Sequence, residues 1–211
     1  MKVSLLMDNP RSWFAPYADE LEIKLRDRGH EVVRVGRAED LPEGDCTFFL
    51  SCEQIIQPEF RARSRHNIVI HASALPRGKG WSPMTWQVLE GKNDIPISMF
   101  EAVDRVDAGD IYATATIHLD GHELIDEMRG KEGNAIVDLA LRFVEEYPMQ
   151  GTPQEGEESF YARRSPKDSE LNPEKSIAEQ FNLLRIVDNE RYPAHFTLNG
   201  KTYVLKIFKK E

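Results

Sequence analysis

Two short segments of the chain carry side chains that can do acid–base chemistry. The first segment, Ile70–Pro83 (IHASALPRGKGWSP), contains His71, whose imidazole can carry a proton near neutral pH. Gly78 and Gly80 follow in the same segment and would let the backbone approach a ligand closely. The second segment, Asp104–Asp110 (DRVDAGD), holds three carboxylates. A histidine beside a carboxylate can move a proton and stabilise charge, so the two segments are candidate halves of one active site.

Each segment also has a plain structural interpretation. His71 could be held by a backbone carbonyl, the Arg77–Gly80 stretch could be a surface turn, and Asp104–Asp110 could be a solvated loop. Trp81 is of a residue type that more often packs in a core than lines a ligand site. The functional interpretation therefore depends on the two segments meeting in space.

Strand and helix patterns alternate along the region that contains these segments. Such alternation predicts an α/β fold with a Rossmann-like, doubly wound, mostly parallel sheet. The predicted strands are Val3–Met7, Glu31–Val35, Cys46–Leu50, Asn67–Ile70, Ile97–Val103 and Ile111–Leu119, and the predicted helices are Pro16–Asp27, Ser82–Glu90 and Glu123–Tyr147. Sheets of this kind bind ligands beyond the carboxyl ends of their strands, where His71 falls. Because no Gly-rich turn follows the first strand, NAD or FAD is not expected.

The chain divides into a main domain and a small appendage. Residues 1–150 are predicted to form the catalytic domain, and residues 151–172 a linker, because the stretch Pro148–Ser159 is rich in Pro, Gly and Glu. Residues 173–211 are predicted to form a helix (Glu174–Ile186) and a β-hairpin that turns at Asn199-Gly200. The apolar alternation of this hairpin requires a partner surface, either on the main domain or on a second copy, so a homodimer is expected.

The composition limits the partners of the chain. It has 211 residues and a formal net charge of -9, which opposes binding to nucleic acid, since that depends on lysines and arginines displacing counterions. No apolar run approaches the roughly 18 residues of a membrane span, and the chain starts in a predicted strand rather than a signal peptide. Cys46 and Cys52 have neither the number nor the spacing of a disulfide framework or zinc site. We therefore expect a cytoplasmic protein without a metal, a membrane partner or a nucleic-acid partner.

Three motifs in order connect the chain to a known family. His71–Pro76 (HASALP), Lys79–Pro83 (KGWSP) and Asp107–Gly109 (DAG) resemble the motifs of the formyltetrahydrofolate-dependent formyltransferases. Members of that family carry Asn-x-His running into Ser-Leu-Leu-Pro, then Arg-Gly-x-x-Pro, and later Asp-x-Gly. The tail looks like the segment after the catalytic domain in some sugar N-formyltransferases, through Arg163–Pro166, Asn182–Arg185 and Tyr192–Phe196.

The resemblance implies the formyltransferase fold and transfer of a formyl group from N10-formyltetrahydrofolate to a primary amine of a small molecule, an amino sugar. It places the catalytic histidine and aspartate of the family on His71 and Asp107. The pterin of the donor would lie against Gln54, Ile55, Ile56, Asp104, Val106 and Asp107. The acceptor would contact Ser73, Arg77, Lys79 and Trp81. The Lys79–Ser82 stretch is similar to a sub-branch that acts on pseudaminic-type nonulosonic sugars.

One departure from the family pattern affects the expected site. The catalytic asparagine of the family, two residues before the histidine, is replaced by Val69. Asn67 lies on the same face of the predicted strand, but roughly 13 Å from His71 at the usual rise per residue. Asn67, Ser73 or a backbone N–H group remain candidates for the missing donor. The alternatives to a transferase are a formyltetrahydrofolate hydrolase and a catalytically degenerate folate- or sugar-binding module.

Overall fold

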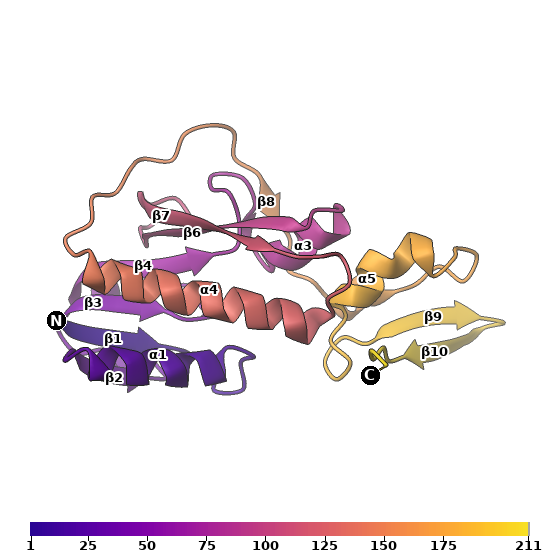
Figure 1. Ribbon diagram of the computed structural model, residues 1–211, viewed down its shortest axis with the longest axis horizontal. Coiled ribbons are helices and arrows are strands. Elements are labelled where there is room, and N and C mark those ends of the chain that lie inside the picture. The colour runs from indigo at the N-terminus through magenta and orange to yellow at the C-terminus, as the bar shows by residue number, and fades with distance from the viewer. Residues whose placement is uncertain (211) are drawn as a thin grey trace.

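A six-stranded sheet with the strand order β2-β1-β3-β4-β6-β7 forms the centre of the molecule (Figure 1). The structure, a computed structural model, describes residues 1–210. The sheet consists of β1 (Lys2–Leu6), β2 (Glu31–Val35), β3 (Gly44–Phe49), β4 (Ser64–His71), β6 (Asp94–Glu101) and β7 (Ile111–His118). The first four strands run parallel, and antiparallel pairings join β4 to β6 and β6 to β7. The expected α/β fold with a mostly parallel sheet is confirmed.

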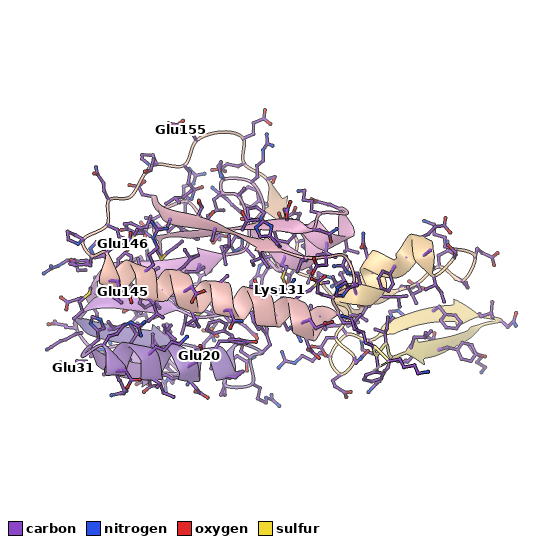
Figure 2. All side chains as sticks on the ribbon, viewed as in Figure 1. Glu20, Glu31, Lys131, Glu145, Glu146 and Glu155 are labelled. Carbon is purple, nitrogen blue, oxygen red and sulfur yellow. The ribbon has the colours of Figure 1, made fainter. Side chains whose placement is uncertain are left out.

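Two long helices, α1 (Ala15–Asp27) and α4 (Ile125–Glu145), lie side by side on one face of the sheet (Figure 1). Because side chains alternate along a strand, Leu5, Phe48 and Ile68 pack in the core beneath these helices. Their neighbours Leu6, Phe49 and Val69 face the other side, which is covered by the short η1 (Ala38–Asp40) and α2 (Pro58–Arg61). The charged side chains of Glu145, the last residue of α4, and of Glu146, which follows it, project outward (Figure 2).

The loop after β4 is covered by a segment from far along the chain. The loop forms β5 (Lys79–Gly80) and leads into α3 (Pro83–Leu89). After α4 the chain runs back along the sheet to β8 (Phe160–Tyr161), which pairs in parallel with β5 (Figure 1). The composition of segment 151–172 predicts a linker. In the structure, Thr152 of this segment forms a β-bridge with Ile111, and the segment contains η2 (Pro166–Ser169). Residues 158–161, here called the strap, therefore lie against the His71 loop.

The appendage contains η3 (Ala178–Gln180), α5 (Phe181–Ile186) and a hairpin of β9 (Ala194–Leu198) and β10 (Lys201–Leu205). The predicted hairpin turn at Asn199-Gly200 is confirmed, and both residues have positive φ. The predicted helix starts later than Glu174. The reason is a capping box at Ser176, whose hydroxyl accepts from the Glu179 N–H while the Glu179 carboxylate accepts from the Ser176 N–H.

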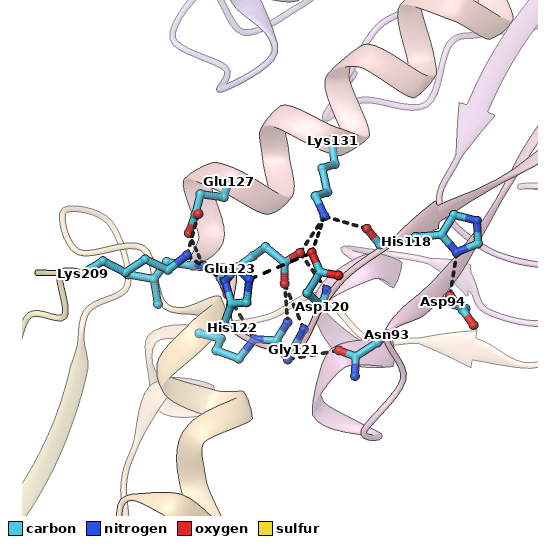
Figure 3. A network of polar contacts seen from close by, with 12 residues as sticks. Asn93, Asp94, His118, Asp120, Gly121, His122, Glu123, Glu127, Lys131 and Lys209 are labelled. Atoms are coloured by element: carbon cyan, nitrogen blue, oxygen red, sulfur yellow. Dashed lines mark hydrogen bonds and ion pairs between the residues drawn. The ribbon is translucent and has the colours of Figure 1, made fainter. Parts of the chain in front are cut away.

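A buried ion pair fixes the appendage to the main domain. Arg185 of α5 and Glu123, just before α4, are each 2% exposed, and their side chains are 3.3 Å apart. Lys131 of α4 also reaches Glu123 at 2.6 Å, and Lys209 pairs with Glu127 (Figure 3). Ile186 of α5 joins the main core. The hairpin extends beyond the body of the molecule and exposes Leu198, Tyr203 and Val204 (Figure 1).

Residues 1–210 lack two kinds of structural feature. No helix within this range combines the length and the apolar character that a bilayer crossing requires. No group of three or more His, Cys, Asp or Glu side chains in this range is arranged to hold a metal ion.

Candidate active site

Two cavities meet at His71, beyond the carboxyl ends of the parallel strands. Cavity A, of about 310 Å³, is lined by the loop after β3, by Val69 and by the loop Val103–Asp107. Cavity B, of about 350 Å³, lies toward α4 and the tail and is lined by residues such as Glu132 and Tyr192. Both volumes fall in the range of small-molecule sites, about 300–1,000 Å³. The residues that line both cavities are Ser51, Cys52, Glu53, Ile70, His71, Gly80 and Trp81.

His71 is the last residue of β4, and its ring is held by the loop that follows. Its Nε2 donates a hydrogen bond to the carbonyl oxygen of Gly78 at 2.9 Å. The same nitrogen lies 3.9 Å from Oδ2 of Asp107, and the two side chains are 11% and 12% exposed. The structure thus brings together the two residues that the sequence predicts as the catalytic pair. At this separation the carboxylate and the imidazole are close enough to act on the same bound molecule, although no direct hydrogen bond joins them.

Asp107 is held in a strained loop that is anchored on three sides. Its φ is +50°, in the left-handed region that costs free energy for a residue with a side chain. Oδ2 accepts from the Gly80 N–H at 2.8 Å, and the Gln154 amide donates to the carbonyl oxygens of Asp107 and Gly109. A Cβ at Gly109 would stand 1.8 Å from the Glu101 carbonyl oxygen, so only glycine permits this close packing. The Asp-x-Gly spacing therefore has a local steric cause.

Left-handed backbone is concentrated around the two cavities. Within residues 1–210, the non-glycine residues with positive φ are Ser51, Ser82, Asp107 and Asn199. Ser51 and Asp107 line cavity A, and Ser51 and Ser82 line cavity B, whereas Asn199 is in the hairpin turn. A strained backbone conformation of this kind costs free energy and persists only where the surrounding structure enforces it, which is common at ligand sites.

The residues predicted to contact the donor all line cavity A: Gln54, Ile55, Ile56, Asp104, Val106 and Asp107. Asp8 anchors one wall, because its carboxylate accepts from the N–H groups of Glu53 and Gln54 at 2.9 Å. Arg61 anchors the other wall through the Ala102 carbonyl and the Asp104 carboxylate. The Nε of Arg61 is buried without a partner among residues 1–210. Cavity A therefore combines apolar walls with fixed polar groups.

The residues predicted to contact the acceptor are distributed over different environments. Trp81 lines both cavities, and the guanidinium of Arg163 stacks 4.5 Å from its ring centroid. Arg77 is exposed and lies outside the linings of both cavities. Ser73 is buried outside them, and its Oγ has no partner among residues 1–210. Sequence reasoning placed these residues together because they are neighbours in the chain.

Lys79 is held by the strap and is only 1% exposed. Its Nζ donates to Glu158 at 2.7 Å, and Arg105 binds the same carboxylate at 2.9 Å. Lys79 lines neither cavity, and Glu158 already neutralises its charge within the protein. The expected contact of Lys79 with an acceptor therefore finds no support in its position.

Asn67 is also engaged elsewhere. Its amide nitrogen donates to the carbonyl oxygen of Arg61 at 2.9 Å, and its side chain is absent from the linings of both cavities. Its backbone N–H donates to Glu101 at 2.6 Å. Val69, which replaces the family asparagine, lines cavity A as an apolar wall. Asn67 therefore supports the strand in this structure and does not face the reacting centre.

The two cysteines are neutral thiols. Burial raises the pKa of Cys46 well above its ordinary value and raises the pKa of Cys52 to about 12. Cys52 lines both cavities, but a thiol that stays protonated is a poor nucleophile. Both residues are free cysteines, in agreement with their expected reduced state.

Three residues that line or support the candidate site were missed by sequence reasoning: Glu132, Gln154 and Glu158. Glu132 has a local signal, because a carboxylate occupies the apolar stripe of α4 between the buried Met128 and Ile136. Gln154 and Glu158 lie in a segment of linker-like composition and carry no such signal. Their contacts with Asp107 and Lys79 depend on the return of the chain across the sheet.

Comparison with known proteins identifies the family. The family model described as "Formyl transferase" matches residues 21–138, which include His71 and Asp107. Methionyl-tRNA formyltransferase of Malacoplasma penetrans (strain HF-2) is 30% identical over 147 residues, which are 67% of this chain and 45% of that protein. The chain thus spans less than half the length of this curated relative.

Solved structures share the fold over nearly the whole chain. Methionyl-tRNA formyltransferase from Clostridium thermocellum has a TM-score of 0.83 at 19% identity, covering 100% of this chain and 94% of that one. A likely sugar N-formyltransferase from Mycobacterium tuberculosis has a TM-score of 0.74 at 15% identity, with coverages of 100% and 98%. HypX from Aquifex aeolicus in complex with tetrahydrofolic acid has a TM-score of 0.75 at 18% identity, with coverages of 98% and 37%. Because the family model covers more than half of the sequence, the chain belongs to the formyl transferase family.

Proposed function

We propose that this protein is an N-formyltransferase that moves a formyl group from N10-formyltetrahydrofolate to a primary amine of a small acceptor, an amino sugar. One observation carries the proposal: two cavities of ligand size meet at the buried pair His71 and Asp107. A transferase that joins two substrates requires such a junction, because each substrate needs a cavity and the reacting atoms must come within about 3–3.5 Å.

Cavity A has the chemistry that a pterin requires. Ile55, Phe100 and Val106 provide apolar surface for a flat heterocycle, and the loop Ala102–Asp107 provides backbone hydrogen-bonding groups. We assign cavity A to the folate, which supplies the formyl group, and cavity B to the acceptor.

The catalytic pair would stabilise charge and accept a proton. In the reaction a bond forms between the acceptor nitrogen and the formyl carbon, and the bond from that carbon to N10 breaks. One proton leaves the acceptor nitrogen, and N10 gains one. His71 would donate to the formyl oxygen, as that oxygen gains negative charge, from Nδ1, the ring nitrogen that does not bind the Gly78 carbonyl. Asp107 would accept the proton of the amine at Oδ1, because Oδ2 is bound by the Gly80 N–H.

The missing asparagine changes how the formyl oxygen is stabilised. Asn67 and Ser73 do not line either cavity, and Val69 has no hydrogen-bond donor in its side chain. We therefore assign the stabilisation to His71 together with backbone N–H groups at the junction. This assignment predicts a slower enzyme than one with a second side-chain donor, since one such donor typically contributes about a hundredfold to a thousandfold in rate.

The choice of an amino sugar over a tRNA depends on charge. The formal net charge of -9 opposes association with a polyanion. Relatives described as methionyl-tRNA formyltransferases and as sugar N-formyltransferases both share the fold, so methionyl-tRNA is the second candidate acceptor. A pseudaminic-type sugar as the acceptor, a homodimer formed through the exposed hairpin and a cytoplasmic location remain predictions.

An assay with three arms tests the proposal. The protein is incubated with formyltetrahydrofolate alone, with nucleotide-linked amino sugars or amino nonulosonates, and with methionyl-tRNA, and products are detected by mass. Formylated sugar is the expected product. Release of formate without an acceptor would identify a hydrolase, formylation of the tRNA alone would replace the acceptor, and folate binding without turnover would indicate a binding module.

A further inference from the structure

Glu132 is a carboxyl group in an otherwise apolar stripe of α4. It lies between the buried residues Met128 and Ile136, and it lines cavity B with Ile136 and Phe14. Burial raises the pKa of its carboxyl group to about 7. A position on this stripe is normally occupied by a hydrophobic residue that packs against the sheet.

No protein group satisfies this carboxyl. Within residues 1–210, neither a hydrogen bond nor an ion pair reaches Glu132, and the charge that acts on it is that of Arg129. Arg129 is bound to Asp188 at 3.0 Å and to Asp126 at 3.5 Å. Glu132 is half-buried, so its hydrogen bonds must come from water or from a bound molecule. Its position on the wall of cavity B means that a bound molecule can supply that partner.

The other charged groups of cavity B indicate what kind of molecule would bind. Four arginines line the cavity: Arg129, Arg163, Arg164 and Arg191. Of the carboxylates there, Asp188 neutralises Arg129, and Glu53 lies 3.6 Å from Arg163. Arg164 has a buried Nε without a partner among residues 1–210. The lining of cavity B therefore carries more positive than negative side chains. This excess of positive charge favours an anionic substituent of the bound molecule near the arginines, and it disfavours an additional cation beside Glu132.

We propose that Glu132 is a specificity residue that binds a hydroxyl group of the acceptor in cavity B. The inference rests on the proposed function and narrows its substrate class to an amine that carries hydroxyl groups and an anionic group. A carboxyl that is partly protonated near neutral pH can both donate to and accept from a hydroxyl group. Glu132 then contributes to acceptor affinity and not to the chemical step at His71.

Calorimetric titration of the full chain tests this inference without requiring turnover. The probes are glucosamine 6-phosphate, a nucleotide-linked amino sugar and a diamino nonulosonate, with tetrahydrofolate as the probe of cavity A. The variants are Glu132→Gln, Glu132→Leu and the control Asp138→Asn, an exposed acid six residues further along α4. For the probe that binds most tightly, we expect Kd to change less than about threefold in Glu132→Gln and to rise about tenfold to a hundredfold in Glu132→Leu. Tetrahydrofolate should bind all variants equally.

Two results would overturn the inference. An unchanged Kd in Glu132→Leu would show that Glu132 does not touch the acceptor. Equal losses in Glu132→Gln and Glu132→Leu would show that the carboxylate binds a cation, such as the ammonium group of the amine. Where turnover is measurable, KM should rise in Glu132→Leu with kcat unchanged. Failure of the proposed function is separate, since wild-type protein would then bind tetrahydrofolate and a probe without forming product.

Discussion

His71 and Asp107 are held by the same short piece of backbone. The Gly78 carbonyl accepts a hydrogen bond from His71 Nε2 at 2.9 Å, and the Gly80 N–H donates to Asp107 Oδ2 at 2.8 Å. The imidazole and the carboxylate are 3.9 Å apart as a result. The position of β5 therefore fixes the geometry of the proposed catalytic pair.

Loss of either charged partner should abolish most of the activity. For His71→Asn and Asp107→Asn we expect kcat/KM to fall about a hundredfold to a thousandfold with folding unchanged, because both groups act on charge at the reacting centre. Formyl transfer by mass detection and thermal unfolding measure the two effects. Asp110→Asn is the control, since Asp110 is exposed in the same loop and lines neither cavity. Near wild-type rates in His71→Asn would remove His71 from the site.

The strap should be required for catalysis although it does not touch the reacting atoms. In Glu158→Gln the buried Lys79 loses its carboxylate partner, so β5 and the Gly80 N–H that binds Asp107 should shift. We expect kcat/KM to fall by about tenfold to a hundredfold, as for small misplacements of catalytic groups. Glu157→Gln, a change at the exposed neighbouring residue, should have no effect. Equal activity of the two variants would show that the strap does not position the pair.

The buried pair of Arg185 and Glu123 should dominate the docking of the appendage. Arg185→Met leaves Glu123 with Lys131 as its charged partner, and the loss of the hydrogen bonds made by Arg185 should cost about 1–3 kcal/mol. Arg142→Met, which breaks an exposed pair with Glu146 on the same domain, should cost less than about 0.5 kcal/mol. Urea denaturation measures both free energies of unfolding. Similar values for the two variants would contradict a structural role for the buried pair.

Acid should weaken the same contact in a defined pH range. Burial favours the neutral form of Glu123, but hydrogen bonds from Lys131 and from the Asp120 N–H outweigh it and lower the pKa to about 2, from 4.5. The folded chain thus binds fewer protons than the unfolded chain between these values. The stabilising contribution of the Glu123 carboxylate is present above pH 4.5 and is lost as the pH falls toward 2. In Glu123→Gln the free energy of unfolding should depend less on pH in this range.

Glu132 should have the opposite effect. Because burial raises its pKa from 4.5 to about 7, the folded chain binds more protons than the unfolded chain between these values, and stability falls as the pH rises. Glu132→Gln removes this ionisation. The variant should match wild type near pH 4.5 and be more stable above pH 7, by at most about 3 kcal/mol. Denaturation of both proteins across this range, with Asp138→Asn as the control, measures the difference. A parallel pH dependence would show that Glu132 is well solvated.

The amino-acid sequence by itself determined the order of the elements and pointed to the proposed catalytic pair. Apolar runs and helical spacing are local signals, and they predicted the parallel strands and α1, while the Asn-Gly dipeptide predicted the turn at Asn199-Gly200. The motifs at His71 and Asp107 predicted two segments that the structure places 3.9 Å apart. The residues that the family resemblance predicts to contact the donor all line cavity A.

Only the tertiary structure decided which charged groups are free to meet a ligand. Lys79 is neutralised by Glu158, which is 79 residues further along the chain, and Asn67 is bound to the Arg61 carbonyl. Glu132, in contrast, is left without a protein partner on the wall of cavity B. Residue type gives the charge of a side chain, but its pairing depends on long-range contacts that form when the chain folds back on itself. Local sequence patterns do not encode those contacts, because the energy of the contacts comes from burial between segments that are distant in sequence.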